Sequence, residues 1–226
     1  MLGDKVLSKP GGHRTTKAVV GILLGWGLLW VVGTASPAAA EDALVVGSIP
    51  LAFPGQSVSV PIFLRDDDGT LLGADAGTGR TIQNLSLDVR WSPLGAVDSA
   101  VLERAGISAQ PAPIFETAPT ASGQRVLIAS FDETVDPLST TLDPSPPGDL
   151  VAKLTLQIDG GFDLSDLTIT LTPAGTALGN QTGTLVETVG NNRLVLFSGI
   201  VQVNSNGLFA DGFESGDVSA WSNSAP

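Results

Sequence analysis

The chain has 226 residues, with 11 basic and 23 acidic side chains, a formal net charge of −12, one His and no Cys. The acidic balance excludes an ordinary nucleic-acid-binding surface, which needs a basic patch to meet phosphates. The lack of Cys excludes disulfides and a cysteine nucleophile, so apolar burial must stabilise the fold. The single histidine, His13, lies near the N-terminus, and we expect no catalysis through a histidine base.

The first 40 residues have the layout of a bacterial secretory signal. Four basic residues precede an apolar run over 18–35, and Ala38 and Ala40 then supply the small side chains of a signal-peptidase site. We therefore expect a signal-peptide helix over 1–40, cleavage after Ala40, and export to the cell surface or the extracellular medium. The alternative is an uncleaved membrane anchor, because about 18 apolar residues are near the minimum that spans a bilayer.

The chain that would remain after cleavage is more acidic still. It carries 7 basic and 22 acidic residues, because residues 1–40 hold four of the basic residues and only one of the acids; its net charge is −15. Such a charge repels anionic lipid as well as nucleic acid, so we expect no membrane contact once the signal is removed. Size alone predicts one domain plus appendages.

Residues 41–203 predict one all-β domain. Short alternating or continuous apolar runs are separated by Gly, Pro, Asp and Asn, and no stretch keeps a helical period. About nine strands are expected, over 43–48, 58–64, 85–91, 97–104, 125–132, 152–158, 167–171, 184–188 and 192–203. They would form an antiparallel β-sandwich whose two sheets share one core.

Single residues refine this picture. Pro61 cannot donate to a ladder, so its strand is predicted to be an edge strand or to contain a bulge. The runs 125–132 and 192–203 are apolar on both parities, which indicates central strands covered on both faces. Trp91 has the parity of Leu85 and is expected in the core.

Three connections are long enough to be functional or mobile, namely 66–81, 107–123 and 136–149. After residue 203 the composition becomes polar, so 204–226 is predicted to be a linker and a separate tail. Residues 211–221, DGFESGDVSAW, resemble a short C-terminal motif of the form DGFESGDxSxW that recurs in exported bacterial proteins.

The order of landmarks over roughly 44–203 resembles a cohesin domain. These landmarks are FPGQSV at 53–58, NLSLDVRWSP at 84–93, the apolar run 126–131, GDLVAKL at 148–154 and FSGIVQV at 197–203. The resemblance implies a nine-stranded jelly roll related to the family-2 and family-3 carbohydrate-binding modules. It also implies a non-catalytic module that attaches a dockerin-like protein through a sheet face, within machinery that handles polysaccharides.

This chain departs from the cohesin pattern at two places. Ser92 stands where an acidic residue often precedes the proline of the turn, and residues 66–81 resemble an insertion. Both departures leave the jelly roll in place and bear on the identity of the partner. No residue matches a motif sharp enough to assign a binding residue from the family.

The acidic run in the loop 66–81 raises the question of a metal. Asp66, Asp67 and Asp68 precede Gly69, and carboxylate oxygens suit calcium. The run does not follow the EF-hand register, because aligning Gly69 with the loop glycine places Leu64 at the first ligand position. A different calcium site here, or at the tail acids Asp211, Glu214 and Asp217, and ordinary turn acids both remain open.

Four functions remain compatible with these residues. Attachment of a protein partner is the leading hypothesis. A carbohydrate-binding module is the first alternative, although its sugar platform would have only Trp91 and Trp221. A structural surface protein is the second, and a hydrolase working through carboxylates such as Asp132 and Glu133 is the last.

Overall fold

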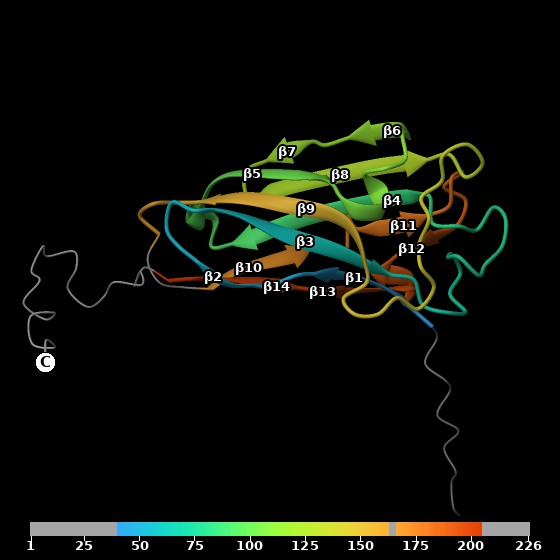
Figure 1. The fold of residues 1–226 in the computed structure, drawn as a ribbon, viewed down its shortest axis with the longest axis horizontal. Helices are drawn as coiled ribbons and strands as arrows, with labels where there is room; N and C mark the ends of the chain where they lie inside the picture. The colour runs from blue at the N-terminus through green and yellow to red at the C-terminus, as the bar shows by residue number, and fades with distance from the viewer. Residues whose placement is uncertain (1–39, 163–165, 205–226) are drawn as a thin grey trace, which may run out of the picture. The chain divides into compact units, whose positions relative to one another are not determined.

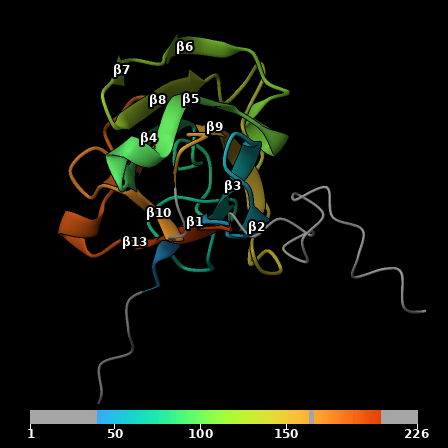
Figure 2. The same cartoon turned by 90° about the vertical axis from the view of Figure 1, so that its left-hand side faces the viewer.

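The computed structural model describes residues 40–162 and 166–204, which fold into two β-sheets packed face to face (Figures 1 and 2). Fourteen strands and three short 3₁₀ helices make up this part, and no α-helix lies within it. None of its helices has the length and apolar character needed to cross a membrane. The all-β prediction is confirmed, whereas the predicted signal segment before Ala40 and the tail after Asn204 lie outside the described residues.

The first sheet has the strand order β13-β1-β3-β9-β5. Its strands are β1 (Asp42–Val46), β3 (Ser57–Arg65), β5 (Val97–Arg104), β9 (Asp149–Ile158) and β13 (Leu194–Phe197). The neighbours β1, β3, β9 and β5 are antiparallel, while β13 runs parallel to β1. The sheet therefore brings strands from the two ends of the domain side by side.

The second sheet is built around β4 (Asn84–Ser92). Along one edge of β4 lies β8 (Gln124–Phe131), and its other edge is shared by β10 (Asp166–Leu171) and β11 (Ala177–Gly179). The remaining strands are β14 (Gly199–Val203), β2 (Ile49–Ala52), β12 (Val186–Glu187), β6 (Pro113–Thr117) and β7 (Thr120–Ala121). The strands β6 and β7 pair with β8 and lie outside it in Figure 2, and β2 runs parallel to β14.

Alternating side chains of the two sheets form one core. In β3, for example, Val60 and Ile62 are fully buried between exposed or half-buried neighbours. Trp91 is only 6% exposed, as predicted, and the guanidinium of Arg125 lies 5.5 Å from the centre of its ring. With no disulfide available, the apolar core between the two sheets supplies the main stabilisation of the sandwich.

Several strands differ from the sequence prediction. The strands β2, β6 and β7 lie where none was expected, because they are short and carry little alternation. The run 192–203 divides into β13 and β14, which belong to different sheets, and Phe197 and Ile200 are 48% and 40% exposed. The prediction of a central strand covered on both faces is therefore wrong for this run. For β8 the central position is confirmed, because β4 lies on one edge and β6 and β7 on the other, but its outer side chains are only half-buried.

Pro61 illustrates how a proline is accommodated inside a sheet. The strand β3 lies between β1 and β9, so the edge-strand prediction is wrong. The register of the β3–β9 pair shifts between Ile62 and Phe63, directly after Pro61, so the predicted bulge is present. On the other side, Pro61 uses its carbonyl to accept a 2.8 Å hydrogen bond from the amide of Gly47.

We expect the Leu154→Ala substitution to lower the free energy of unfolding by about 3 kcal/mol. Leu154 is fully buried in β9, opposite Val60 on one side and Leu102 on the other, so truncation leaves a cavity. Urea denaturation monitored by tryptophan fluorescence measures this change. Thr155→Ala is the matched control, because its hydroxyl bonds only Ser59 at 3.1 Å on the exposed face, and it should cost about 1 kcal/mol or less.

Candidate functional site

The outer face of the second sheet combines apolar and polar side chains. Ile128 of β8 lies opposite Ser86 of β4, and Phe115 of β6 is 54% exposed. Ser86 and Ile128 lie on this face because their neighbours Leu85, Leu127 and Ala129 point into the core. Phe115 belongs to the same face because it lines one hollow with Ser86 and Ile128. We refer to this surface as the β4–β8 face, and it comprises Ser86, Arg90, Phe115, Val126 and Ile128.

One end of the β4–β8 face is hollowed. The hollow has a volume of about 140 Å³, and mostly apolar side chains line it. They include Phe115, Ile128, Ala177, Leu178 and Val186. A small apolar hollow ringed by polar groups can receive one side chain of a docked protein.

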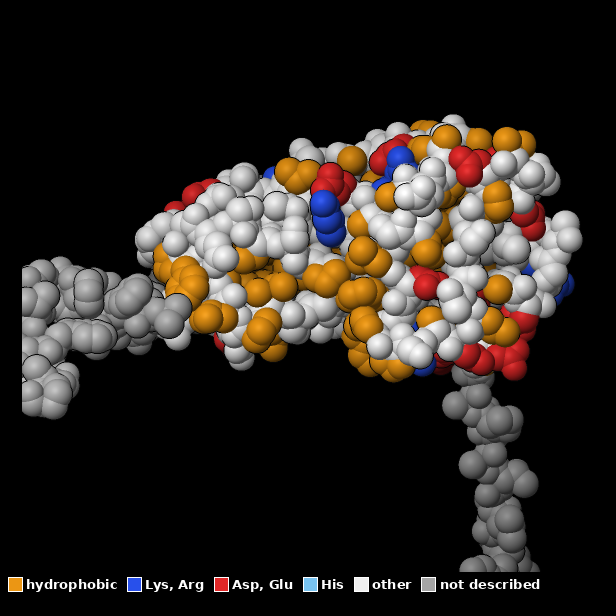
Figure 3. Space-filling model, in the orientation of Figure 1, with side chains coloured by type: hydrophobic (Ala, Val, Ile, Leu, Met, Phe, Trp, Pro, Cys, Tyr) orange, Lys and Arg blue, Asp and Glu red, His pale blue; other side chains and the backbone are white. Residues whose placement is uncertain are grey.

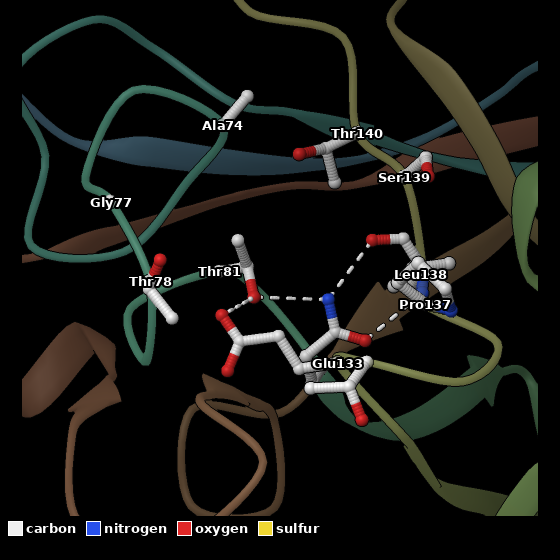
Figure 4. A pocket seen from close by; sticks show the side chains of 11 residues that line it. Ala74, Gly77, Thr78, Thr81, Glu133, Pro137, Leu138, Ser139 and Thr140 are labelled. Atoms are coloured by element: carbon white, nitrogen blue, oxygen red, sulfur yellow. Dashed lines mark hydrogen bonds between the residues drawn. The ribbon is translucent and has the colours of Figure 1, made fainter.

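A second, polar depression of about 440 Å³ lies between the loop 66–81 and the segment 133–140. In Figure 4, Glu133 and Thr81 point toward one another, and Thr81 donates to Glu133 Oε1 over 2.9 Å. The backbone amide of Gly79 donates to the same oxygen over 2.7 Å. Glu133 therefore anchors the loop 66–81, which leaves little freedom for proton transfer.

The neighbouring Asp132 also has a structural role. Its Oδ1 accepts hydrogen bonds from the amides of Thr134 and Val135 and from the Thr134 hydroxyl, at 2.8 to 3.0 Å. These bonds lower the pKa of Asp132 below its ordinary value. The general acid of a glycosidase needs the opposite shift, so Asp132 is not suited to that role.

The three aspartates proposed as calcium ligands turn toward three different neighbours. Asp66 is buried, and its Oδ2 accepts from the amide of Ala74 over 2.9 Å and from the Thr140 hydroxyl. Asp67 forms an ion pair with Arg65 at 3.2 Å. The exposed Asp68 lies beside other acids, and its pKa is raised, mainly by a hydrogen bond with Asp75.

Two further acids near this loop were not predicted from the sequence. Asp42, at the start of β1, and Glu187, in β12, are both fully buried. Burial, together with the adjoining Glu187 carboxylate, raises the pKa of Asp42 to about 9. Asp66 is the third buried acid, and desolvation raises its pKa as well. A charged residue in a short, weak strand is the only sequence signal that could have identified Glu187.

Acidic side chains also gather on the surface at this end of the sandwich (Figure 3). Within residues 40–162 and 166–204, no group of three or more His, Cys, Asp or Glu side chains has the arrangement of a metal site. Trp221 and the tail acids Asp211, Glu214 and Asp217 lie outside the described residues. The described part thus offers three features: the β4–β8 face, the polar depression and the buried acids.

With calcium chelated, we expect stability to decrease as the pH rises from about 4 to about 9. The pKa of Asp42 is about 9 in the folded state against 3.8 as its ordinary value. Across this interval the folded state keeps a proton on Asp42 that the unfolded state releases. The stabilisation that this bound proton gives the folded state is therefore lost as the pH rises. Urea denaturation in EDTA near pH 5 and pH 8 measures the change, and Asp42→Asn should reduce it. Equal stability at both values would contradict this account.

Comparison with known proteins identifies the fold. No family model and no curated protein matches the sequence. The solution structure of CaCohA2 from Clostridium acetobutylicum aligns with 75% of this chain and 95% of its own, at 14% identity and a TM-score of 0.52. The third cohesin of ScaC from Acetivibrio cellulolyticus, solved with the ScaB dockerin, aligns with 73% of this chain and 99% of its own, at 19% identity and a TM-score of 0.51.

A third similar structure comes from Clostridium thermocellum. It is the complex of Coh-OlpA with Doc918, described as a type I cohesin–dockerin complex, and it aligns with 72% of this chain and 99% of its own, at 12% identity and a TM-score of 0.50. These identities establish similarity of fold alone. The two packed sheets of this chain therefore form a cohesin-like β-sandwich of the jelly-roll type.

Proposed function

We propose that this protein is a non-catalytic module that binds another protein through the β4–β8 face. The observation that carries the proposal is the exposed Phe115 at the apolar hollow, on a face that also presents polar side chains such as Ser86 and Arg90. Central apolar contacts ringed by polar groups are typical of protein interfaces that form and dissociate. The cohesin-like fold adds the chemistry of the partner, a dockerin-like module.

Sugar binding receives less support from the same residues. A planar sugar platform needs exposed aromatic rings, and Trp91 is buried beneath Arg125. Among the described residues, the aromatic side chains that are largely exposed are Phe115 and Phe197, and they lie on strands of different sheets. A polysaccharide ligand is therefore an outcome of the binding test below and not the function proposed here.

The cellular setting is part of the proposal. The signal-like layout of 1–40 supports export, and the resemblance to cohesins supports a role at the cell surface or in the medium, linked to assemblies that handle polysaccharides. A non-catalytic role agrees with the turn-anchoring bonds of Asp132 and Glu133. Association with nucleic acid or lipid is opposed by the acidic charge.

We expect affinity capture from the secretome of the source organism to retain a protein that contains a dockerin-like module. The bait is the purified product of the full-length gene, immobilised with and without calcium. Phe115→Ala should weaken binding of the captured partner at least tenfold, because truncating a central aromatic contact removes buried apolar area. Titration calorimetry with the purified partner gives the dissociation constants.

Phe197→Ala is the matched control for this experiment. Phe197 is exposed to nearly the same extent as Phe115, 48% against 54%, but belongs to the first sheet. Its replacement should leave the affinity unchanged. Retention of glycan alone would replace this proposal with carbohydrate binding, and equal losses in the two variants would place the interface elsewhere.

We expect bacteria that express the full-length chain to secrete a product that begins at Glu41. Intact-mass measurement should give the mass of residues 41–226. Ala40→Leu should block processing, because the signal-peptidase pocket admits only a small side chain at this position. Full-length protein retained in the membrane fraction of the unmodified strain would instead establish the anchor alternative.

A further inference from the structure

The buried acids Asp42 and Glu187 are held in place by the loop 66–81. Asp42 Oδ1 accepts a 3.0 Å hydrogen bond from the amide of Asp67. Glu187 Oε1 accepts 2.9 and 3.0 Å bonds from the amides of Leu71 and Leu72. Each carboxylate therefore has one oxygen fixed by backbone N–H groups of the same loop.

The second oxygen of each acid has no donor. Asp42 Oδ2 and Glu187 Oε2 are buried without a hydrogen-bond partner, and the two carboxylates lie within hydrogen-bonding reach of each other. Asp66 is a third negative group nearby, and its buried Oδ1 also lacks a partner. Two adjacent carboxylates without a hydrogen-bond donor between them repel one another unless a proton or a cation is bound between them.

No cationic side chain supplies that charge. The four ion pairs among residues 40–162 and 166–204 involve neither Asp42 nor Glu187. Arg65, which directly precedes the loop, is paired with Asp67, and Arg80 within the loop is exposed and absent from these four pairs. A bound proton or a bound cation must therefore neutralise the two adjoining carboxylates.

We propose that Asp42 and Glu187 bind a calcium ion between β1, β12 and the loop 66–81. The unpartnered oxygens Oδ2 of Asp42 and Oε2 of Glu187 supply the two anionic ligands. No third His, Cys, Asp or Glu side chain completes this site in the described ranges, so the proposal requires backbone carbonyls or water as the remaining ligands.

The chemistry of the donors selects calcium among common cations. Both side-chain donors are carboxylates, and residues 40–162 and 166–204 contain neither His nor Cys, which disfavours zinc. Irregular loop carbonyls suit the flexible coordination of calcium better than the strict octahedron of magnesium. A site with two carboxylates belongs to the weaker class found in extracellular modules, with dissociation constants of about 0.1 to 1 mM.

The ion would join three segments that are distant in sequence. Asp42 begins the first strand, Glu187 lies in a two-residue strand near the end of the domain, and the loop between β3 and β4 contacts both. An ion bound between these segments stabilises the folded state, and the free energy of unfolding rises with the calcium concentration. This inference is independent of the partner proposed for the β4–β8 face.

The full-length chain is expressed, and the purified protein is treated with EDTA to remove bound metal. The test is titration of this protein with calcium. Calorimetry should detect binding, and 10 mM calcium should raise the melting temperature by about 3 °C or more relative to EDTA. Magnesium at the same concentration should produce less than half of this shift. Glu187→Gln should abolish the calcium response, and Asp42→Asn is the second variant if the first does not fold.

Asp166→Asn is the control for charge. Asp166 is an exposed acid on β10, so its replacement makes the same change of net charge and should preserve the full calcium response. A melting temperature insensitive to calcium would overturn the proposal and assign a shared proton to the pair. A calcium response that survives Glu187→Gln and Asp42→Asn would also overturn it, because the exposed acids Asp68 and Asp75 would then hold the ion.

Discussion

Interlocking of the apolar side chains between the two sheets is the contact on which the other features of this protein depend. The chain has no disulfide to close its loops, so strand alternation has to supply the whole core. Leu154 and Trp91 lie on opposite sheets and belong to the same cluster. Because these side chains take the inner positions, their neighbours Thr155 and Arg90 are presented to solvent or to a partner.

The loops extend this framework at one end. The segment 66–81 has no strand of its own, and carboxylates from other elements hold it in place. Glu133 fixes one side of the loop through Gly79 and Thr81, and Glu187 fixes the other through Leu71 and Leu72. An insertion that would be costly to order by apolar contacts is thus ordered by backbone amides that donate to acids.

Long strands with one buried face were predictable from the sequence, because burial on one side imposes a period of two on β3, β4, β9 and β10. The short strands β2, β6 and β7 were not, since a few residues at an edge carry too little pattern. The division of 192–203 was missed because an apolar run does not reveal which sheet each half joins.

The candidate sites, like the strands, were predictable from the sequence only in part. Acids in a visible run, Asp66 to Asp68, drew attention, but their side chains diverge. Asp42 and Glu187 were missed because they belong to strands of different sheets and meet only when the sheets pack. A single acid in a strand also normally indicates exposure. Phe115 was missed because its loop was not predicted to contain a strand.

The parallel pairing of β1 with β13 has a mechanical consequence. These strands lie near the two ends of the described domain and are paired in register over four positions, from Asp42 with Leu194 to Val45 with Phe197. A force that pulls the start of β1 away from the end of β13 acts along these two strands in opposite directions. The backbone hydrogen bonds between β1 and β13 are then loaded together in shear and must break at the same time. In a hairpin pulled at its open end, by contrast, the bonds break one after another.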